Sequence, residues 1–164
     1  MNPIILYRLS RRLHLMGAVR IARLVYRLNY FLSGCSIPPQ VSIGTGFRLP
    51  DYGNGVIMNA AVEIGNDVMI LPHVVLGQNV RKGREVVSAN IRIGDGVVIG
   101  AGAKVIASGE LTIGPGAVIG ANAVVIRSVP DGATAVGIPA KLIRTSERDA
   151  DAIERIAVLG EFLE

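Results

Sequence analysis

Residues 91–106 read IRIGDGVVIGAGAKVI, with an aliphatic residue at every sixth position: Ile93, Ile99 and Val105. A period of six is neither the 3.6 of a helix nor the 2 of an ordinary strand. It is typical of a parallel β-helix, whose coils stack and bury one aliphatic column per face. The same period recurs at Ile37, Ile43, Leu49, Ile64, Ile70, Leu76, Ile113, Ile119 and Val125.

Three six-residue repeats make one triangular coil of about 18 residues, so residues 37–128, less one loop, predict about four to five coils. Small side chains are expected to fill the narrow interior near the corners, at Ala101, Ala103, Ala117 and Ala123. The composition agrees, since half of the residues are hydrophobic, aromatic residues make up only 4% and tryptophan is absent. The sequence therefore predicts one domain of mainly β structure.

Cys35 is the single cysteine in the sequence. One cysteine excludes an intramolecular disulfide framework and favours a reducing, cytoplasmic location. We expect Cys35 to be a small buried hydrophobic residue rather than a redox group.

The beginning of the chain is basic, because seven arginines and no acidic residue precede Asp51. Apolar residues and arginines follow one another with helical spacing, which predicts amphipathic helices over residues 3–15 and 18–32 in a basic segment 1–34. Neither apolar run reaches the roughly 18 to 20 residues of a transmembrane span. No small-residue cleavage site follows an apolar run, so a signal peptide is not expected either.

Two interpretations of this basic segment stay open. Residues 1–33 can lie on the anionic inner face of a membrane, which attracts basic amphipathic helices. The helices can instead pack on the β-helix or on neighbouring subunits, with arginines paired to the acidic tail: Glu147, Asp149, Asp151 and Glu154. Nucleic acid is not an expected partner, because no aromatic-basic platform accompanies the arginines.

Two segments interrupt or end the repeat. Residues 78–90 are polar and are expected to leave the coil as a protruding loop, the kind of insertion that often forms part of a binding face. Turn residues between Pro130 and Pro139 end the repeat. Ser146, with Asp149 three residues later, offers the cap of a C-terminal helix over 145–164. The predicted β-helix therefore covers residues 35–144.

Three runs carry a resemblance to a known family: AAVEIGNDVMILPHVVLGQN (60–79), IRIGDGVVIGAGAKVI (91–106) and LTIGPGAVIGANAVVIRSVPDGATAVGIPAKLI (111–143). Residues 37–144 resemble the hexapeptide-repeat acyltransferases, closest to the serine acetyltransferase branch and its polysaccharide O-acetyltransferase relatives of the colanic-acid and capsule type. The resemblance implies a left-handed β-helix and a homotrimer with active sites between adjacent subunits. It also implies acetyl-CoA as co-substrate, with no tightly bound cofactor.

Carried over by position, the resemblance places the pantetheine arm of acetyl-CoA along a corner near Gly77, Gly102 and Ala103. Small side chains there would let the arm approach the backbone, and an amide near Gly77 or Gly102 would stabilise the oxyanion. Lys141 and Arg144 are expected to pair with phosphate. The expected contacts of the adenosine and phosphate end are Ala121, Gly137, Ile138, Pro139 and Lys141.

The catalytic positions depart from the family pattern. In serine acetyltransferases a histidine follows an aspartate just before a corner, and a second histidine ends the protruding loop. Here Asp51 matches the aspartate, Tyr52 stands at the first histidine, and the loop ends in Ala89-Asn90. The chain has two histidines, and His14 lies in a predicted helix, which leaves His73.

His73 is the candidate general base, since the ordinary pKa of histidine suits removal of a hydroxyl proton near neutral pH. A corner or interface histidine without a catalytic role is the alternative. Asp51 is expected to orient His73 or to bind acceptor hydroxyls. Tyr52, Asn54 and Asn90 are the expected acceptor contacts.

The expected function is acetyl-CoA-dependent O-acetylation of a sugar, or of a polysaccharide or glycolipid precursor, because most residues that would hold serine are absent. One alternative is a serine O-acetyltransferase-like enzyme with an altered acceptor, and another is a non-catalytic hexapeptide-repeat scaffold. No metal site is expected. A zinc carbonic anhydrase on this scaffold needs a histidine ligand set that two histidines cannot supply.

Overall fold

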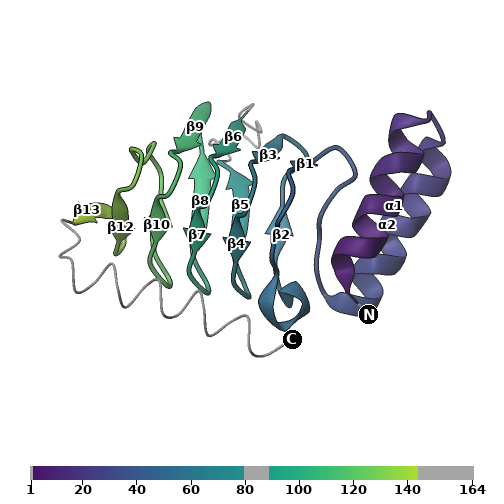
Figure 1. Ribbon diagram of the computed structural model, residues 1–164, viewed down its shortest axis with the longest axis horizontal. Coiled ribbons are helices and arrows are strands. Elements are labelled where there is room, and N and C mark those ends of the chain that lie inside the picture. Colours follow the sequence, from purple (N-terminus) through teal and green to yellow (C-terminus); the bar gives the residue numbers. More distant parts are fainter. Residues whose placement is uncertain (1, 80–88, 144–164) are drawn as a thin grey trace.

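A computed structural model describes residues 2–79 and 89–143 as two helices followed by a solenoid of short strands (Figure 1). The strands of these ranges form three sheets, which we call first, second and third in the order in which a coil passes through them. The first sheet contains β1 (Ser42–Ile43), β3 (Val62–Ile64), β6 (Asn90–Ile93) and β9 (Glu110–Ile113). The second contains β4 (Met69–Ile70), β7 (Val98–Ile99), β10 (Val118–Ile119), β12 (Thr134–Val136) and β13 (Lys141–Ile143). The third contains β2 (Ile57–Met58), β5 (Val75–Gln78), β8 (Lys104–Ala107) and β11 (Val124–Val125).

Parallel pairing between coils keeps the aliphatic residues in register. In the first sheet Ile64 pairs with Ile93, and Ile93 pairs with Ile113. The other two sheets align Ile70, Ile99 and Ile119, and Leu76, Val105 and Val125. These nine residues are at most 5% exposed, and each buried aliphatic side chain contributes roughly 1.5–3 kcal/mol. The six-residue period therefore builds the core, and the predicted fold class is confirmed.

The four alanines predicted to fill the interior near the corners occupy two kinds of position. Ala103, Ala117 and Ala123 are fully buried, as predicted. The prediction for Ala101 was wrong, because this residue lies half-buried in a turn. The coil corners are therefore built partly from alanines that face inward and partly from alanines in the turn itself.

Two predicted segments reach beyond the described residues. Gln78 ends β5 and Asn90 begins β6, so the two ends of the predicted loop belong to strands. Residues 80–88 and the predicted C-terminal helix at 145–164 lie outside the described part of the chain. The acidic tail that would pair with the arginines lies outside it too.

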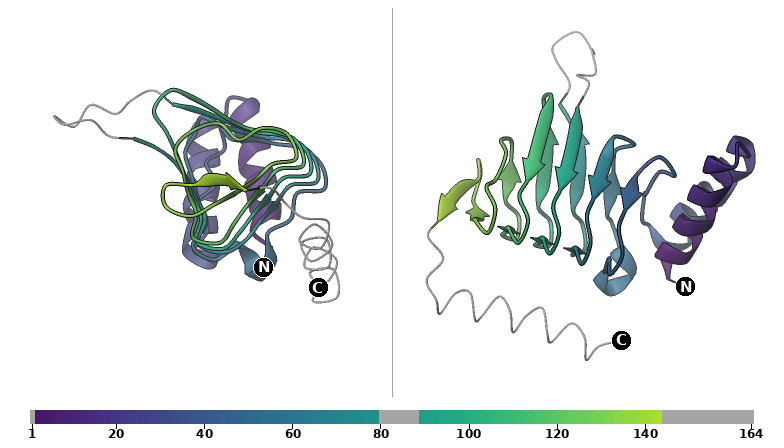
Figure 2. Two further views of the ribbon diagram at one scale, coloured as in Figure 1. Left: turned by 90° about the vertical axis from the view of Figure 1, so that its left-hand side faces the viewer. Right: turned by 45° about the horizontal axis from the view of Figure 1, so that its top comes forward.

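The helices α1 (Pro3–Leu15) and α2 (Val19–Ser33) form a hairpin at the front end of the solenoid (Figures 1 and 2). Asn2 caps α1, since its side chain accepts a hydrogen bond from the Ile4 amide (3.0 Å), and Pro3 suits the first turn. Gly34 ends α2 in a left-handed conformation (φ 67°). Both helices agree with the predicted ranges to within a residue.

Two side chains of α1 fix the hairpin to the first coil. The Tyr7 hydroxyl donates to the Val41 carbonyl (2.7 Å), and the Arg11 guanidinium donates to the same carbonyl (2.6 Å). Burial raises the pKa of Tyr7, while the positive charges of Arg11 and Arg8 partly offset that rise. Arg8 donates to the Gly44 carbonyl (3.2 Å). Some of the arginines therefore hold the hairpin on the solenoid, in line with the packing interpretation.

Candidate functional site

Most of the predicted site residues gather along one edge of the solenoid, which we name the His73 corner. It consists of the turns that lead from the second sheet to the third, at residues 49–56, 71–74, 100–103 and 120–123. Backbone hydrogen bonds stack these turns: the His73 amide donates to the Asn54 carbonyl (2.8 Å), and the Gly102 amide donates to the Pro72 carbonyl (2.9 Å). The predicted residues in this corner are Asp51, Tyr52, Asn54, His73, Gly102, Ala103 and Ala121.

Several residues of the His73 corner have a left-handed backbone. Tyr52 (φ 56°) lies in the 3₁₀ turn η1 (Pro50–Gly53), and His73 (φ 62°) lies in the next coil. Gly102 (φ 71°) and Asn122 (φ 56°) continue the series. Glycine and asparagine adopt this conformation readily, whereas a tyrosine or histidine there is strained. The turns from the first to the second sheet share this conformation at Gly46, Asp67, Gly96 and Gly116, so only the bulky residues Tyr52 and His73 make the His73 corner unusual.

The His73 side chain packs directly on the backbone of Gly55. A methyl group at Gly55 would overlap the imidazole, and its nearest ring atom would be Nδ1. Gly55 also has a left-handed backbone (φ 69°), so glycine suits this position for two reasons. The sequence analysis missed Gly55, because the six-residue repeat is interrupted between Leu49 and Ile57 and carries no signal for this contact.

Asn122 is a second residue of the His73 corner that the sequence analysis missed. It is exposed and follows Ala121, and its side-chain amide lies against the backbone of Gly102. Its place in its coil corresponds to that of His73 and Gly102 in theirs. A comparison of the coils position by position could have found it.

His73 and Asp51 are both exposed, but the predicted orienting contact between them is not formed. Over residues 2–79 and 89–143, no hydrogen bond joins the His73 imidazole to another residue. Asp51 lies in the turn one coil earlier, beside Tyr52, which is 64% exposed. A single chain therefore presents an open imidazole without a carboxylate partner.

Three predictions for the acetyl-CoA path need correction. Ala103 is fully buried, and its carbonyl accepts a hydrogen bond from the Val75 amide (3.0 Å), so it has no surface to offer a ligand. The Gly102 amide already donates to Pro72 and is not free to stabilise an oxyanion. Gly77 lies within strand β5, paired with Ile106, and not in the His73 corner.

Asn90 lies at the opposite edge of the third sheet from His73. It begins β6 after the turn from the third sheet to the first, and its amide donates to the Gly109 carbonyl (3.0 Å). Five residue steps separate Val74 from Asn79, which corresponds to roughly 15 Å of strand. One chain therefore does not bring Asn90 and His73 together.

The outer surface of the third sheet between these two edges is mostly apolar, with one exposed lysine, Lys104, paired between Val75 and Val124. Ile57 is 46% and Ile126 is 52% exposed, and Val75, Ile106 and Val124 are half-buried. By contrast, the outer surface of the first sheet is polar and carries an ion pair between Arg92 and Glu63 (3.5 Å). The described part of the chain thus has one solvated wall and one wall suited to burial.

The other predicted residues for the adenosine and phosphate end lie just beyond the last turn of the His73 corner. Gly137 and Ile138 directly follow β12, and the Gly137 carbonyl accepts a hydrogen bond from the Val124 amide (3.0 Å). Lys141 begins β13 and pairs with Val136. Lys141 and Ile138 are both exposed, which leaves the ammonium group available to an anion. Arg144 lies outside the described residues.

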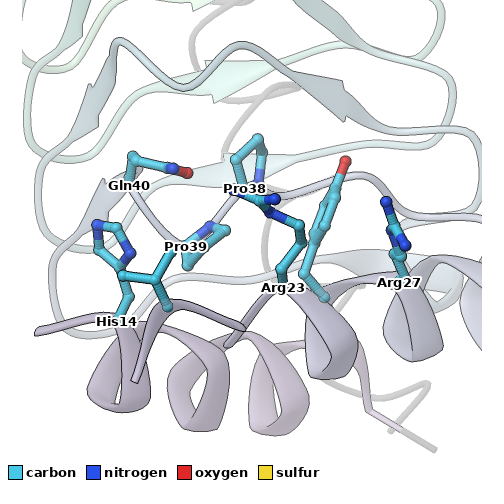
Figure 3. A pocket seen from close by; sticks show the side chains of 8 residues that line it. His14, Arg23, Arg27, Pro38, Pro39 and Gln40 are labelled. Carbon is cyan, nitrogen blue, oxygen red and sulfur yellow. The ribbon is translucent and has the colours of Figure 1, made fainter. Parts of the chain in front are cut away.

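A separate cavity of about 200 Å³ lies between the helical hairpin and the first coil (Figure 3). Arg23 and Arg27 point from α2 toward the segment that carries Pro38, Pro39 and Gln40. His14 also lines this cavity, so the second histidine of the chain is far along the sequence from the His73 corner and belongs to another element. The cavity contains none of the predicted site residues.

The His73 corner can supply a proton acceptor on an exposed surface, with a basic group at one end of a straight run of turns. Imidazole can take a proton from a hydroxyl group, and an ammonium group can bind phosphate. Within the described ranges no three His, Cys, Asp or Glu residues lie close enough to hold a metal ion. In these same ranges no helix is both long and apolar enough to cross a bilayer.

No family model matches this sequence. Among curated proteins, the chain is 40% identical over 143 residues to a serine acetyltransferase of Helicobacter pylori, and the match covers 87% of this chain and 80% of that protein. A solved structure of soybean serine acetyltransferase complexed with serine superposes with a TM-score of 0.76 at 34% identity, covering 86% of this chain and 56% of that one. A serine acetyltransferase complexed with CoA has the same TM-score at 32% identity, covering 86% and 55%. The chain thus spans most of the bacterial relative but just over half of these two solved chains.

Proposed function

This chain belongs to the serine acetyltransferase family of hexapeptide-repeat acyltransferases, and we propose that it transfers the acetyl group of acetyl-CoA to a hydroxyl group at the His73 corner. The observation that carries this proposal is the single run of turns from Tyr52 and His73 to Gly137, with Lys141 beyond it. One end of this run holds a proton acceptor, His73, and the other end holds a cation, Lys141. Acetyl-CoA needs both, because its thioester must lie near a base while its phosphates lie far from that base.

His73 is proposed as the general base. The Nδ1 side of its ring packs against Gly55, so Nε2 is the nitrogen proposed to take the proton of the acceptor. The acceptor hydroxyl attacks the thioester carbonyl as its proton passes to His73, and a tetrahedral oxyanion forms. The C–S bond then breaks, and the CoA thiolate leaves with the proton that His73 returns. The products are the acetylated acceptor and free CoA, and His73 ends the reaction in its starting protonation state.

The acceptor supported by the relatives is serine or a compound like it. The soybean structure contains serine, and the H. pylori relative is a serine acetyltransferase. Tyr52 and Ala89-Asn90, however, stand where the family pattern has histidines, so we propose a serine O-acetyltransferase-like enzyme with an altered acceptor contact. Tyr52, Asn54 and Asn90 are the proposed acceptor contacts, and Asp51 is proposed to bind the acceptor.

A sugar hydroxyl is the second candidate acceptor. The changed residues at Tyr52 and Asn90 favour it, but none of the relatives above is a polysaccharide O-acetyltransferase. A panel of acceptors separates the two: serine, homoserine and threonine on one side, and common hexoses and amino sugars on the other. CoA release is measured with a thiol reagent for each. Release with serine alone supports the first candidate, and release with sugars alone supports the second.

The assembly is proposed to be a homotrimer whose active sites lie between subunits. The mostly apolar outer surface of the third sheet supports this, since exposed aliphatic patches mark interfaces. So does the distance of roughly 15 Å between the two edges of that sheet, because a neighbour could bring its own Asn90 edge to the His73 corner. Co-expressed His73→Asn and Asn90→Ala subunits should then regain activity that neither variant has alone. Activity no higher than the sum of the two would show that the residues work within one chain.

Two tests decide between an enzyme and a non-catalytic scaffold. Calorimetric titration with acetyl-CoA should show saturable binding near one site per chain. Thiol release with the acceptor panel should then separate wild type from His73→Asn. Binding without release for every acceptor would favour the scaffold, and equal release in both proteins would remove His73 from the mechanism.

We also propose a cytoplasmic location for the protein, with residues 1–33 in peripheral contact with a membrane.

A further inference from the structure

The helical hairpin exposes a broad apolar surface on the side away from the solenoid. Its members, which we name the outer face, are Ile5, Leu9, Met16, Leu24, Leu28 and Phe31. These side chains are strongly exposed to solvent: Phe31 is 84%, Leu24 is 67% and Ile5 is 64% exposed. A contiguous apolar patch on a folded surface marks an interaction site.

Helix geometry places these side chains together. In α1 the buried residues Tyr7 and Ser10 face α2 and the first coil, and Ile5 and Leu9 lie on the opposite side of the helix. In α2 the buried residues are Ala22 and Asn29, and Leu24, Leu28 and Phe31 lie opposite them. Figures 1 and 2 show the solenoid on only one side of the hairpin. The outer face therefore has no partner among the described residues.

The charges beside the outer face have one sign. Arg12 lies three residues after Leu9 and four before Met16, and Arg20 lies four before Leu24, so both guanidinium groups border the apolar side chains. Arg8 and Arg11 are used in bonds to the first coil, and Arg23 and Arg27 point into the cavity of Figure 3. No aspartate or glutamate precedes Asp51. The whole hairpin is thus cationic.

We infer that the outer face docks on the surface of an anionic phospholipid bilayer, with Leu24, Leu28 and Phe31 in the interfacial region and Arg12 and Arg20 on lipid phosphates. Amphipathic helices of this kind lie in the membrane plane, and anionic lipid attracts their basic residues. The helices, of 13 and 15 residues, are too short to span the bilayer. This orientation holds the solenoid away from the lipid.

A second copy of the hairpin is a poorer partner for this face. Two outer faces in contact would bring Arg12 and Arg20 of both copies together, and neither hairpin has an acidic residue to pair with them. Like charges brought together at an interface disfavour association. An anionic lipid surface supplies the missing negative charge and accepts the apolar side chains as well.

This inference rests on the proposed membrane contact of residues 1–33, and it is tested without acetyl-CoA, so its failure is separate from a failure of acetyl transfer. The full chain is floated with phosphatidylglycerol vesicles and with phosphatidylcholine vesicles. Binding is expected to phosphatidylglycerol alone and to weaken as salt is raised. The double variant Arg12→Gln/Arg20→Gln should bind roughly 25-fold more weakly, since each arginine contributes about fivefold. Leu24→Ser/Phe31→Ser should lose most of the binding.

Matched controls come from the solenoid. Arg92→Gln removes one exposed arginine of the first sheet, and Leu142→Ser removes an exposed leucine (55%) at the far end. Both should float like wild type. Sedimentation velocity without vesicles should give wild type and Leu24→Ser/Phe31→Ser the same mass. A smaller mass for that variant would assign the outer face to a protein interface and overturn the inference. Equal flotation of outer-face variants and wild type, or no flotation of wild type, would overturn it as well.

Discussion

The imidazole of His73 rests on the backbone of Gly55, one coil earlier in the same corner. The amide of His73 donates a hydrogen bond to the carbonyl of Asn54, the residue before Gly55 (2.8 Å). The side chain and the main chain of His73 are thus both positioned by the turn that carries Asp51 and Tyr52. The proposed base and the proposed acceptor contacts form one structural unit.

Gly55→Ala should displace the His73 ring and lower kcat/KM. Removing a general base costs about 10²- to 10⁴-fold, and a displaced ring should approach that loss. Gly96→Ala is the matched control, because Gly96 has a similar backbone (φ 66°) but open space around it. Both variants carry the strain of a left-handed alanine, about 1 kcal/mol, so equal losses of activity would show that the contact with His73 is unimportant.

His73→Asn should lower kcat by about 10²-fold or more and leave acetyl-CoA binding unchanged. Asparagine tolerates the left-handed backbone of this position (φ 62°), so the fold should be kept. Steady-state kinetics and calorimetry on the same preparation separate the two effects. A variant that loses acetyl-CoA binding as well would place His73 in the donor site.

Lys141→Gln should raise the KM for acetyl-CoA about three- to tenfold, with kcat nearly unchanged. An exposed ammonium group on a phosphate is worth about 1 kcal/mol, since solvent screens it. Arg127→Gln is the matched control, because Arg127 is also exposed but lies at a different edge of the solenoid. The same KM for wild type and Lys141→Gln would remove Lys141 from the donor site.

Tyr7→Phe should destabilise the docked hairpin by about 0.5–1 kcal/mol, because the bond from its hydroxyl to the Val41 carbonyl (2.7 Å) is lost. The loss should be at the low end, since Arg11 donates to the same carbonyl. Urea denaturation measures it. Tyr30→Phe, at a tyrosine that is 54% exposed, should have no effect.

Cys35 should make the stability of the protein sensitive to alkaline pH. Burial raises the pKa of its thiol from 9.0 to about 12. Above pH 9 the unfolded chain releases this proton while the folded chain keeps it, so the free energy of unfolding falls as the pH rises from 9 toward 12. Urea denaturation of wild type and Cys35→Ala at pH 8 and 10 measures the contribution as a difference. Parallel pH dependence in the two proteins would show that the thiol is accessible when folded.

The core could be predicted from the sequence because it depends on one repeated property. An aliphatic residue every six positions is visible wherever it occurs, and the columns through Ile93, Ile99 and Val105 follow from it. The two helices were equally visible, through their spacing of apolar residues and arginines.

The site could be predicted only in part, because a corner is defined by the coils above and below it. His73 and Gly102 lie on the same edge of the solenoid, whereas Gly77, five residues from Pro72 along the chain, lies within a strand of the third sheet. The turn that contains Tyr52 has extra residues, which interrupt the six-residue spacing. The contact between His73 and Gly55 therefore has no sequence signal. The burial of Ala103 follows from the direction of its side chain, which spacing alone does not give.

The closing strand β13 also has a consequence for solubility. A stack of parallel strands ends in unpaired amide and carbonyl groups that can recruit another molecule and begin a fibre. In the second sheet β13 folds back antiparallel on β12, with Thr134 opposite Ile143 and Val136 opposite Lys141. The strand that would template further growth is thus already occupied by the protein's own chain. End-to-end polymerisation through the second sheet is blocked there.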